Sequence, residues 1–536
     1  MKRTFVRPEG DNETAKYMII GEQPGKIEVK VGKSFIGASG RVLDECLAIV
    51  GISRSDCYIT NFIKDFDMPL KHYIQNKKKE VTFSKDGLEY LNILKKEVEE
   101  SNANIIFTFG WASTYATTLR LGIKNWRGSI ILIGDKFVIP VYHPATVINS
   151  YGNAEIKGGQ YLNKLLIQFD LQKGKKILED GFSKTIREIL IRPSFIDTME
   201  HLNLLHQKGL MNSIISFDIE VTNEEVSCIS FSPDKNFAIS IPFIYEKGSY
   251  FSVPQEMEVW LSIAKILENP NIKKCGQNLI FDTHFLLRKY GIKTVNICDT
   301  MVAQRTIMID YKVGLDFITS VWTDHEYYKA DGKKYFDGGN NDKLWKYNAT
   351  DSIICSEAYP KQLAELKKQN NEDAYQRQVK IIEPLCYMME KGIKIDVDKM
   401  TQAFEDKLPE INQMRKDLDE LAGQPLNASS SKQIKDYFYG VKKIKPYKHK
   451  GSSTVNEKAL IRIARQGYPE AFKILEIRRA IKNRSTYLNP DKVDKDGRMR
   501  CSFNPVGTKF SRVSSSKNIF GTGNNIQNQP HEILKY

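Results

Sequence analysis

Short apolar runs alternate with helical stretches through the first third of the chain. Apolar runs that predict β-strands lie at residues 17–20, 58–60, 105–109 and 137–141. Between them, segments 41–50 and 88–100 carry apolar residues at helical spacing. This alternation predicts an α/β fold with a parallel sheet covered on both faces, and such sheets bind ligands at the carboxyl ends of their strands. Glu22, Asn61 and His143 each follow a predicted strand, so we expect a site there.

The pattern changes twice further along. A polar stretch at 173–176 predicts a break, and a second strand–helix region begins near residue 187. It holds predicted strands at 213–217, 228–231 and 237–241, and helices from residues 281 and 345. From about residue 371 the pattern is one of long helices rich in Lys, Glu, Gln and Leu. We therefore expect three domains, at 1–175, 186–370 and 371–536.

Composition and charge narrow the class of partner. The 536 residues are 41% apolar and 27% charged, which argues against a disordered chain or a fibre. Lys and Arg number 79 against 65 Asp and Glu, a net charge of +14 that favours a polyanionic partner. The apolar runs are far shorter than the ~20 residues of a membrane span, so we expect nucleic acid and no membrane.

The cysteine pattern indicates the compartment. The eight cysteines are spread along the chain, and none form a C-x-x-C pair. A disulfide framework or a zinc finger needs clustered cysteines. The sequence therefore predicts reduced thiols and a cytoplasmic location, in the host cytoplasm if the protein is viral.

A glycine-rich motif follows the first predicted strand. It reads G-E-Q-P-G-K-I-E at 21–28 and G-K-S-F-I-G-A-S-G at 32–40. These residues resemble the family 4 uracil-DNA glycosylases and their relatives, whose signature is G-E-x-P-G-x-x-E and then G-x-P-F-x-G-x-x-G. Asn61, Arg127-Gly128 and His143-Pro144 follow in the family's order, and the resemblance covers about residues 15–170. It implies a three-layer domain that holds an extruded base in a pocket.

The resemblance also implies roles in that pocket. Phe35 would stack on the base, and the Asn61 amide would bind its Watson–Crick edge. His143 would donate to the charge that develops on the uracil O2 atom. Glu22 would position water or stabilise the cationic sugar, with Glu28 as the other candidate. This reaction needs no metal.

One feature departs from the family. Family 4 enzymes usually hold an iron–sulfur cluster with four cysteines. No cysteine precedes Gly21, Asp65 stands near one expected cysteine position, and Cys46 and Cys57 lie at other spacings. We therefore expect no iron–sulfur cluster, and the domain is either an active glycosylase or an inactive uracil reader.

Acidic residues recur in three motifs of the second region. Asp218 and Glu220 are two apart in a predicted strand and so share a face. Asn278 and Asp282, four apart, are predicted to share a helix face, as are Tyr347 and Asp351. Carboxylates that converge repel one another unless cations lie between them, and hard oxygen ligands suit Mg²⁺ or Mn²⁺. Two such ions can stabilise phosphodiester hydrolysis.

These motifs, in this order, resemble the DEDDy 3′–5′ exonucleases, the ribonuclease H-like proofreading domains of family A DNA polymerases. The resemblance implies that two metal ions are bound by four residues, which are Asp218, Glu220, Asp282 and Asp351. It also implies that Tyr347 orients the attacking water and that Gln277 and Asn278 contact the single-stranded 3′ end.

The last region resembles the first part of a family A polymerase domain. The segments that carry the resemblance are 383–396, 427–433, 474–487, 496–515 and 525–530. The family implies a thumb and the start of a palm that meet the primer–template. Donors suited to phosphates and minor-groove acceptors are Lys482, Arg512, Asn525 and Gln527.

The sequence stops at Tyr536, short of the palm aspartates that the resemblance leads us to expect. We therefore expect no polymerisation by this chain alone, whether it is part of a split polymerase, an exon product or a truncation. The order of domains is similar to a bacteriophage arrangement. The predicted function is DNA replication with metal-dependent 3′–5′ proofreading and uracil excision. The alternative is a non-catalytic, uracil-reading DNA-binding subunit that docks a second polymerase chain.

Overall fold

The protein is described from a computed structural model that covers residues 5–77, 80–148, 159–246, 248–329, 340–449 and 451–530, with side chains of the 159–180 helix from residue 162. The chain divides into two compact units. Unit 1 comprises Met1–Asp282 and Gly291–Val379, and unit 2 comprises Thr283–Tyr290 and Lys380–Tyr536. Every helix in the described part of the chain is too short or too polar to cross a bilayer.

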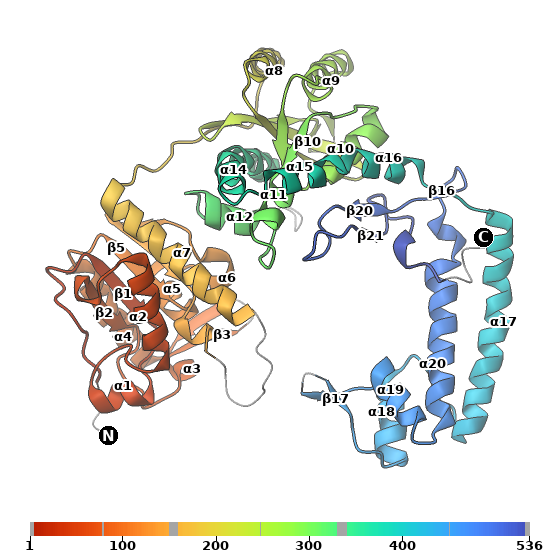
Figure 1. The fold of residues 1–536 in the computed structure, drawn as a ribbon, viewed down its shortest axis with the longest axis horizontal. Helices are drawn as coiled ribbons and strands as arrows, with labels where there is room; N and C mark the ends of the chain where they lie inside the picture. Colours follow the sequence, from red (N-terminus) through yellow and green to blue (C-terminus); the bar gives the residue numbers. More distant parts are fainter. Residues whose placement is uncertain are drawn as a thin grey trace. The chain divides into compact units, whose positions relative to one another are not determined.

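The first part of unit 1 is built on a five-stranded sheet (Figure 1). The strand order is β2 (Cys57–Asn61), β1 (Tyr17–Gly21), β5 (Ile105–Phe109), β7 (Lys136–Val141) and β6 (Ile131–Ile133). The first four run parallel and β6 is antiparallel. Side chains alternate across the sheet, so Ile19 packs into a core with α2 (Ala38–Val50) and α7 (Gly159–Asp180). Ile20 points to the opposite core, with α4 (Lys85–Glu99) and α5 (Trp111–Thr118).

Helices therefore cover both faces, and the predicted mixed α/β class is confirmed. β6 was not predicted because three residues carry too little pattern. The smaller elements of this part are α1 (Lys26–Val31), η1 (Arg54–Asp56), α3 (Leu70–Tyr73), β3 (Ile74–Lys77), β4 (Glu80–Phe83), α6 (Ile123–Trp126) and η2 (Pro144–Thr146).

The second part of unit 1 contains a six-stranded sheet. Its order is β15 (Ile297–Asp299), β14 (Lys274–Gly276), β9 (Ile215–Thr222), β10 (Glu225–Asp234), β11 (Phe237–Pro242) and β8 (Glu188–Leu190). The helix α14 (Asn341–Lys368) packs against β9, β10 and β11. The other elements are α8 (Phe195–Leu210), β12 (Ile244–Tyr245), β13 (Gly248–Ser249), α9 (Val253–Leu267), α10 (Leu279–Tyr290, which the division of units crosses), α11 (Thr300–Ile307), α12 (Leu315–Trp322) and α15 (Glu372–Lys380).

Three predictions of local structure in unit 1 were wrong. The polar stretch 173–176 is no break, because α7 continues through it to Asp180. β9 runs on to Thr222, beyond the predicted end at residue 217, so the acidic pair lies inside the strand. Asn278 precedes α10 with a φ of 59°, and so it does not share a helix face with Asp282. An Asn accepts this left-handed conformation more readily than most residues do.

Unit 2 is mainly helical. Its long helices α17 (Val397–Ala422) and α20 (Pro469–Lys482) lie side by side (Figure 1). A core around Tyr437, Phe438, Leu460 and Ile474 joins them to the smaller helices. The remaining elements are α16 (Ile382–Lys391), β16 (Ile393–Lys394), α18 (Ser431–Lys435), η3 (Asp436–Val441), β17 (Lys448–His449), β18 (Ser452–Ser453), α19 (Glu457–Ala464), η4 (Asn483–Tyr487), η5 (Pro490–Lys492), β19 (Arg498–Met499), β20 (Ser502–Asn504), β21 (Ser514–Ser516) and η6 (Ile526–Asn528).

Candidate active sites

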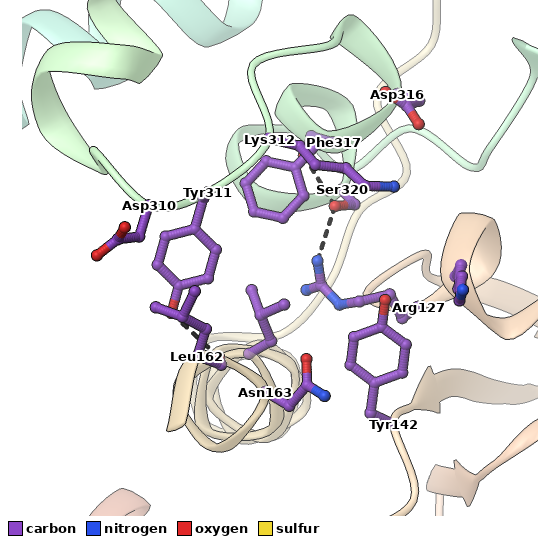
Figure 2. Close-up of a pocket in the computed structure, with 12 residues that line it drawn as sticks. Arg127, Tyr142, Leu162, Asn163, Asp310, Tyr311, Lys312, Asp316, Phe317 and Ser320 are labelled. Atoms are coloured by element: carbon purple, nitrogen blue, oxygen red, sulfur yellow. Dashed lines mark hydrogen bonds between the residues drawn. The ribbon is translucent and has the colours of Figure 1, made fainter. Parts of the chain in front are cut away.

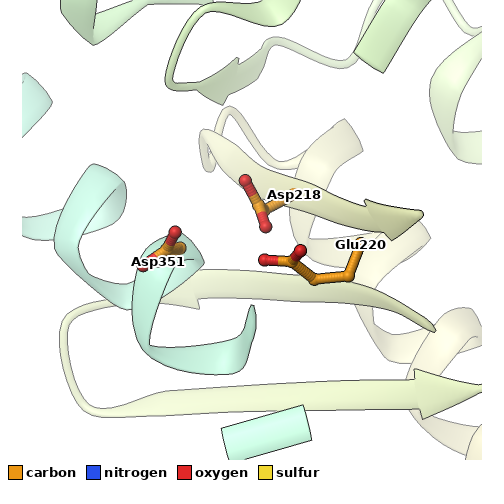
Figure 3. Close-up of side chains that lie close together, drawn as sticks. All are labelled: Asp218, Glu220 and Asp351. Atoms are coloured by element: carbon orange, nitrogen blue, oxygen red, sulfur yellow. The ribbon is translucent and has the colours of Figure 1, made fainter. Parts of the chain in front are cut away.

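Three carboxylates from two distant segments meet in the second part of unit 1. Asp218 and Glu220 come from neighbouring same-face positions of β9, and Asp351 comes from α14. Each offers an oxygen, and these oxygens all lie within 4.8 Å of one another. Figure 3 shows the three side chains pointing toward a common centre. The sequence prediction that these residues converge agrees with this geometry.

The environment of this cluster disfavours negative charge. Burial, together with the nearby Asp351 and Glu220 charges, raises the pKa of Asp218 well above its usual value. Burial and the Asp351 charge raise the pKa of Glu220 to about 8. Asp218 and Glu220 are half-buried and Asp351 is buried, and three carboxylates so close together are costly unless cations compensate them.

One protein cation partly compensates the cluster. Lys329 Nζ donates to Asp351 Oδ2 at 2.5 Å and to the Tyr347 hydroxyl at 2.7 Å. Tyr347 therefore lies beside Asp351 on α14, as their spacing predicted. The Tyr328 hydroxyl donates to the other Asp351 oxygen at 2.5 Å. Sequence analysis missed Lys329 and Tyr328, because neither has a fixed spacing to the acidic motifs.

Asp282 lies apart from the three clustered carboxylates. Its Oδ1 accepts from the backbone N–H of Ile219 at 3.1 Å, so α10 holds it against the strand that carries Asp218 and Glu220. Burial and then the Asp218 charge raise the Asp282 pKa well above its usual value. The residue is thus an electrostatic neighbour of the cluster, although it is outside the group within 4.8 Å among the described residues.

The predicted DNA contacts next to α10 have protein partners. Gln277 Nε2 donates to the Val313 carbonyl at 2.8 Å, and its oxygen accepts from Thr300 at 2.6 Å. The Asn278 N–H donates to Asp299, whose carboxylate also accepts from the first residues of α11. Asp299 therefore has a structural role, and the Gln277 amide is held within the protein.

The donor set fits hard divalent cations. Carboxylate oxygens are the ligands that Mg²⁺ and Mn²⁺ prefer, and a pair of ions would offset the charge of the cluster better than Lys329 alone. Asn348 Nδ2 also fixes the orientation of Asp218, with a hydrogen bond to Oδ2 of 2.8 Å. The cluster can therefore hold metal, and its chemistry does not select one of the two ions.

The second candidate site is a cavity in the first part of unit 1, at the carboxyl ends of β1, β2 and β7. It measures about 440 Å³, and Phe35, Asn61 and His143 are among its lining residues. The Phe35 ring stacks against His143 with centroids 5.9 Å apart. Asn61 Nδ2 donates to Ser34 Oγ at 3.1 Å. Gly21 permits this packing, because a Cβ there would lie 2.2 Å from Asn61 Oδ1.

His143 is set up as a neutral donor. Its Nδ1 accepts from the Ala145 N–H at 3.1 Å, which leaves the proton on Nε2. Burial lowers the pKa of His143 to about 4, so the ring is uncharged near neutral pH. A neutral imidazole that lines the cavity can donate a hydrogen bond there without carrying a charge of its own.

The two candidate carboxylates of this cavity differ in their bonding. Glu28 accepts from Gly25 N at 2.5 Å and Ile36 N at 3.2 Å, and so it ties the glycine-rich loop together. Glu22 accepts from Ala112 N at 2.9 Å, at the start of α5, and burial raises its pKa. Glu28 lines the cavity, whereas Glu22 lies outside its lining.

Asp65, near an expected cysteine position, has a different partner set. Its carboxylate accepts hydrogen bonds from the hydroxyls of Tyr73 and Tyr90. All eight cysteines of the chain are buried. The buried tyrosine–aspartate cluster gives this part of the fold a polar, hydrogen-bonded core.

The predicted DNA donors of unit 2 lie in two places. Lys482, near the end of α20, and Arg512 are exposed. The Asn525 oxygen accepts from Ser515 at 2.7 Å, and Gln527 Nε2 donates to the Val513 carbonyl at 3.2 Å. Asn525 and Gln527 therefore hold the turn around β21, and the two cations remain available at the surface.

Comparisons with known protein families match three consecutive stretches. Residues 8–169 match the uracil DNA glycosylase superfamily, residues 193–365 the 3′-5′ exonuclease family, and residues 397–532 the family A DNA polymerases.

Several curated proteins are similar to parts of the chain. The type-4 uracil-DNA glycosylase of Saccharolobus solfataricus is 31% identical over 218 residues, covering 39% of this chain and 84% of that protein. The corresponding protein of Thermotoga maritima is 26% identical over 182 residues, covering 33% of this chain and 86% of its own length. DNA polymerase I of Chloroflexus aurantiacus is 26% identical over 337 residues, covering 57% of this chain but 35% of that polymerase.

Proposed function

Because the chain belongs, through its N-terminal region, to the uracil-DNA glycosylase superfamily, and because 3′–5′ exonuclease and family A polymerase domains follow, we propose that it is a DNA replication protein whose exonuclease removes nucleotides from 3′ ends. The observation that carries the proposal is the convergence of Asp218, Glu220 and Asp351 within 4.8 Å. The proposed domains are those expected from the sequence, 1–175, 186–370 and 371–536, with the first extended to the end of α7 at Asp180.

The exonuclease site would work through its own polar groups around bound cations. Asp218, Glu220 and Asp351 would hold one or two Mg²⁺ or Mn²⁺ ions, with Asp282 completing the set. The ions would supply charge stabilisation for phosphodiester hydrolysis. Lys329 donates hydrogen bonds to both the Tyr347 hydroxyl and Asp351. The hydroxyl therefore lies close to the carboxylates and is suited to orient the attacking water. Asn278 would contact the single-stranded 3′ end.

Uracil excision is the second proposed activity. The cavity with Phe35, Asn61 and His143 offers an aromatic ring, an amide and a neutral donor, which are the groups that a flipped uracil requires. Glu22, a half-buried carboxylate with a raised pKa, is the group proposed to position water or stabilise the cationic sugar. A domain that binds uracil without excising it is the alternative.

The proposed partners are single-stranded 3′ ends and primer–template DNA, with Lys482 and Arg512 as phosphate contacts and Asn525 and Gln527 as supports. This chain spans about a third of the Chloroflexus polymerase. A second polymerase chain as partner, a bacteriophage origin and a cytoplasmic location complete the proposal. A non-catalytic DNA-binding subunit is the alternative for the whole protein.

One incubation tests both activities. The full chain is mixed with a 5′-labelled single-stranded oligonucleotide that carries an internal uracil, with Mg²⁺ or with EDTA. We expect shortening from the 3′ end that EDTA and Asp218→Ala each abolish. Glu258→Ala, which removes an exposed carboxylate of α9, should leave shortening unchanged.

The two activities fail separately. Uracil release should persist in EDTA and in Asp218→Ala, and His143→Ala should lower it by about 10²–10³-fold, the cost of one lost transition-state donor. Retention of shortening in Asp218→Ala would refute the assigned exonuclease site. Uracil binding with no release would favour the reader, and absence of both activities would favour the binding subunit.

A further inference from the structure

A cleft of about 710 Å³ in unit 1 borders the exonuclease carboxylates. Tyr347, whose hydroxyl is bridged to Asp351 by Lys329, is one of its lining residues. Lys343 and Lys346 line it from the same helix. Arg120 and Trp126, which belong to the stretch that matches the glycosylase superfamily, also line the cleft. The cleft is thus built from two regions with different predicted activities.

The cleft is strongly basic. Five Lys or Arg side chains line it against one carboxylate, that of Glu326. Arg187 is already paired with Asp324 and Glu357, and Glu326 lies 3.5 Å from Lys184 and 3.9 Å from Arg120. Lys343 and Lys346 have no ion-pair partner among the described residues. Cations that lack internal partners are available to phosphates.

Aromatic rings lie among these cations. The Arg120 guanidinium lies over the Trp126 ring at 4.8 Å from its centroid, and Tyr327 meets the same ring edge-on at 5.4 Å. Tyr328 and Tyr347 continue the aromatic lining toward the carboxylates. A basic groove with aromatic walls is the usual construction for single-stranded nucleic acid, since phosphates meet cations and bases stack on rings.

The two walls of the cleft are joined by a buried polar network. Arg127, beside Trp126, pairs with Asp170 of α7 and donates to Ser320 Oγ of α12 at 3.0 Å. Lys173 Nζ donates to the Gly128, Ser320 and Thr323 carbonyls at 2.8, 2.5 and 3.1 Å. Figure 2 shows Arg127 pointing toward Ser320, and both residues line a smaller cavity. These bonds fix Arg120 and Trp126 relative to the exonuclease helices.

We propose that the glycosylase-like region forms one wall of a binding cleft for single-stranded DNA, and that this cleft holds the nucleotides upstream of the 3′ end while that end occupies the carboxylate site. The inference rests on the proposed exonuclease function and adds a role for the first domain that is independent of uracil. Arg120 and Lys343 would contact phosphates from opposite walls, and Trp126 would support a stacked base.

The test compares a long and a short substrate on the full chain. The long substrate is a uracil-free 20-nucleotide single strand, and the short one is the p-nitrophenyl ester of thymidine 5′-monophosphate, which fills the carboxylate site alone. We expect Arg120→Ala, and separately Lys343→Ala, to raise KM for the 20-mer about tenfold with kcat unchanged. Hydrolysis of the ester should stay at the wild-type rate. Lys124→Ala, an exposed lysine of α6 outside the cleft lining, is the matched control.

A binding measurement keeps the inference falsifiable on its own. In an Asp218→Asn background with EDTA, each cleft variant should weaken binding of the 20-mer and reduce the salt slope by about 1, the effect of one lost phosphate contact. Unchanged affinity and KM in both variants would overturn the cleft, as would equal losses on both substrates. A wild-type chain that hydrolyses neither substrate with Mg²⁺ would instead refute the exonuclease proposal, and the binding arm would still decide on the cleft.

Discussion

The buried pair of Arg127 and Asp170 gives the sharpest test of how unit 1 is held together. Their side chains are 2% and 0% exposed. Arg127 Nε donates to Asp170 Oδ2 at 2.9 Å, and one terminal nitrogen donates to the other oxygen, so the pair is bidentate. Arg127→Ala removes the guanidinium and leaves the Asp170 carboxylate buried. It also deletes the hydrogen bond to Ser320.

The expected cost follows from what remains unpaired. Breaking a buried ion pair by removing one partner costs about 3–5 kcal/mol, because the other charge stays in a poorly solvated site. Lys173, whose charge acts on Asp170, offsets part of this loss, so we expect about 3 kcal/mol. The double variant Arg127→Met, Asp170→Leu removes both charges and should lose far less than Arg127→Ala.

Urea unfolding of the full chain measures these differences. The two units need not unfold together, so hydrogen exchange in β7 and α7 should report unit 1 separately. Arg41→Ala, an exposed arginine of α2, is the control and should change the free energy of unfolding by less than about 0.5 kcal/mol. A loss below about 1 kcal/mol in Arg127→Ala, or a double variant as unstable as the single one, would refute the reasoning.

Three further outcomes are expected. The pKa of His143 is about 4 in the folded chain, against an ordinary value of 6.5. Between pH 4 and 6.5 the ring is therefore protonated in the unfolded chain and neutral in the folded chain. The free energy of unfolding should therefore fall as pH drops from 6.5 toward 4, and the same titration of His143→Gln should lack this component. Tyr347→Phe should lower kcat for 3′-end shortening by at least tenfold while single-strand affinity, measured by anisotropy in EDTA, stays unchanged. Glu28→Ala frees the Gly25 and Ile36 N–H groups and should lower the free energy of unfolding by about 1–3 kcal/mol in the same urea assay, which Lys30→Ala should not.

The sequence predicts well those features that depend on short spacings. Asp218 and Glu220 share a strand face, and Tyr347 and Asp351 share a helix face, because two residues of a strand and four of a helix return to the same side. Strands β1, β2 and β5 of the first sheet were predictable because each is a short, fully buried run of mainly apolar residues, whereas β6, with one buried residue in three, carried too little pattern.

Features that depend on distant partners were not predictable. Lys329 joins the carboxylate site from outside any motif, and Asn278 departs from the helix because its N–H is held by Asp299, 21 residues later. The roles of Gln277 and Glu28 changed likewise, because their amide and carboxylate are bonded within the protein. A motif gives the type of side chain at a position, but the partners that occupy its polar atoms come from the tertiary fold.

The positive charge of the chain is a weaker guide to DNA binding than its size suggests. Lys64, Lys136, Lys173 and Lys274 are buried or bonded to backbone carbonyls and carboxylates, and so they hold the fold rather than meet a polyanion. The polar stretch around Lys173 was predicted to separate two domains. The Lys173 ammonium instead donates to backbone carbonyls of both, and it thereby satisfies buried carbonyls that would be costly without a partner. What matters for function is therefore where cations without internal partners gather. In unit 1 the cleft beside Tyr347 is such a place. Substitution of its cations should therefore weaken the binding of single strands more than substitution of an equal number of lysines elsewhere.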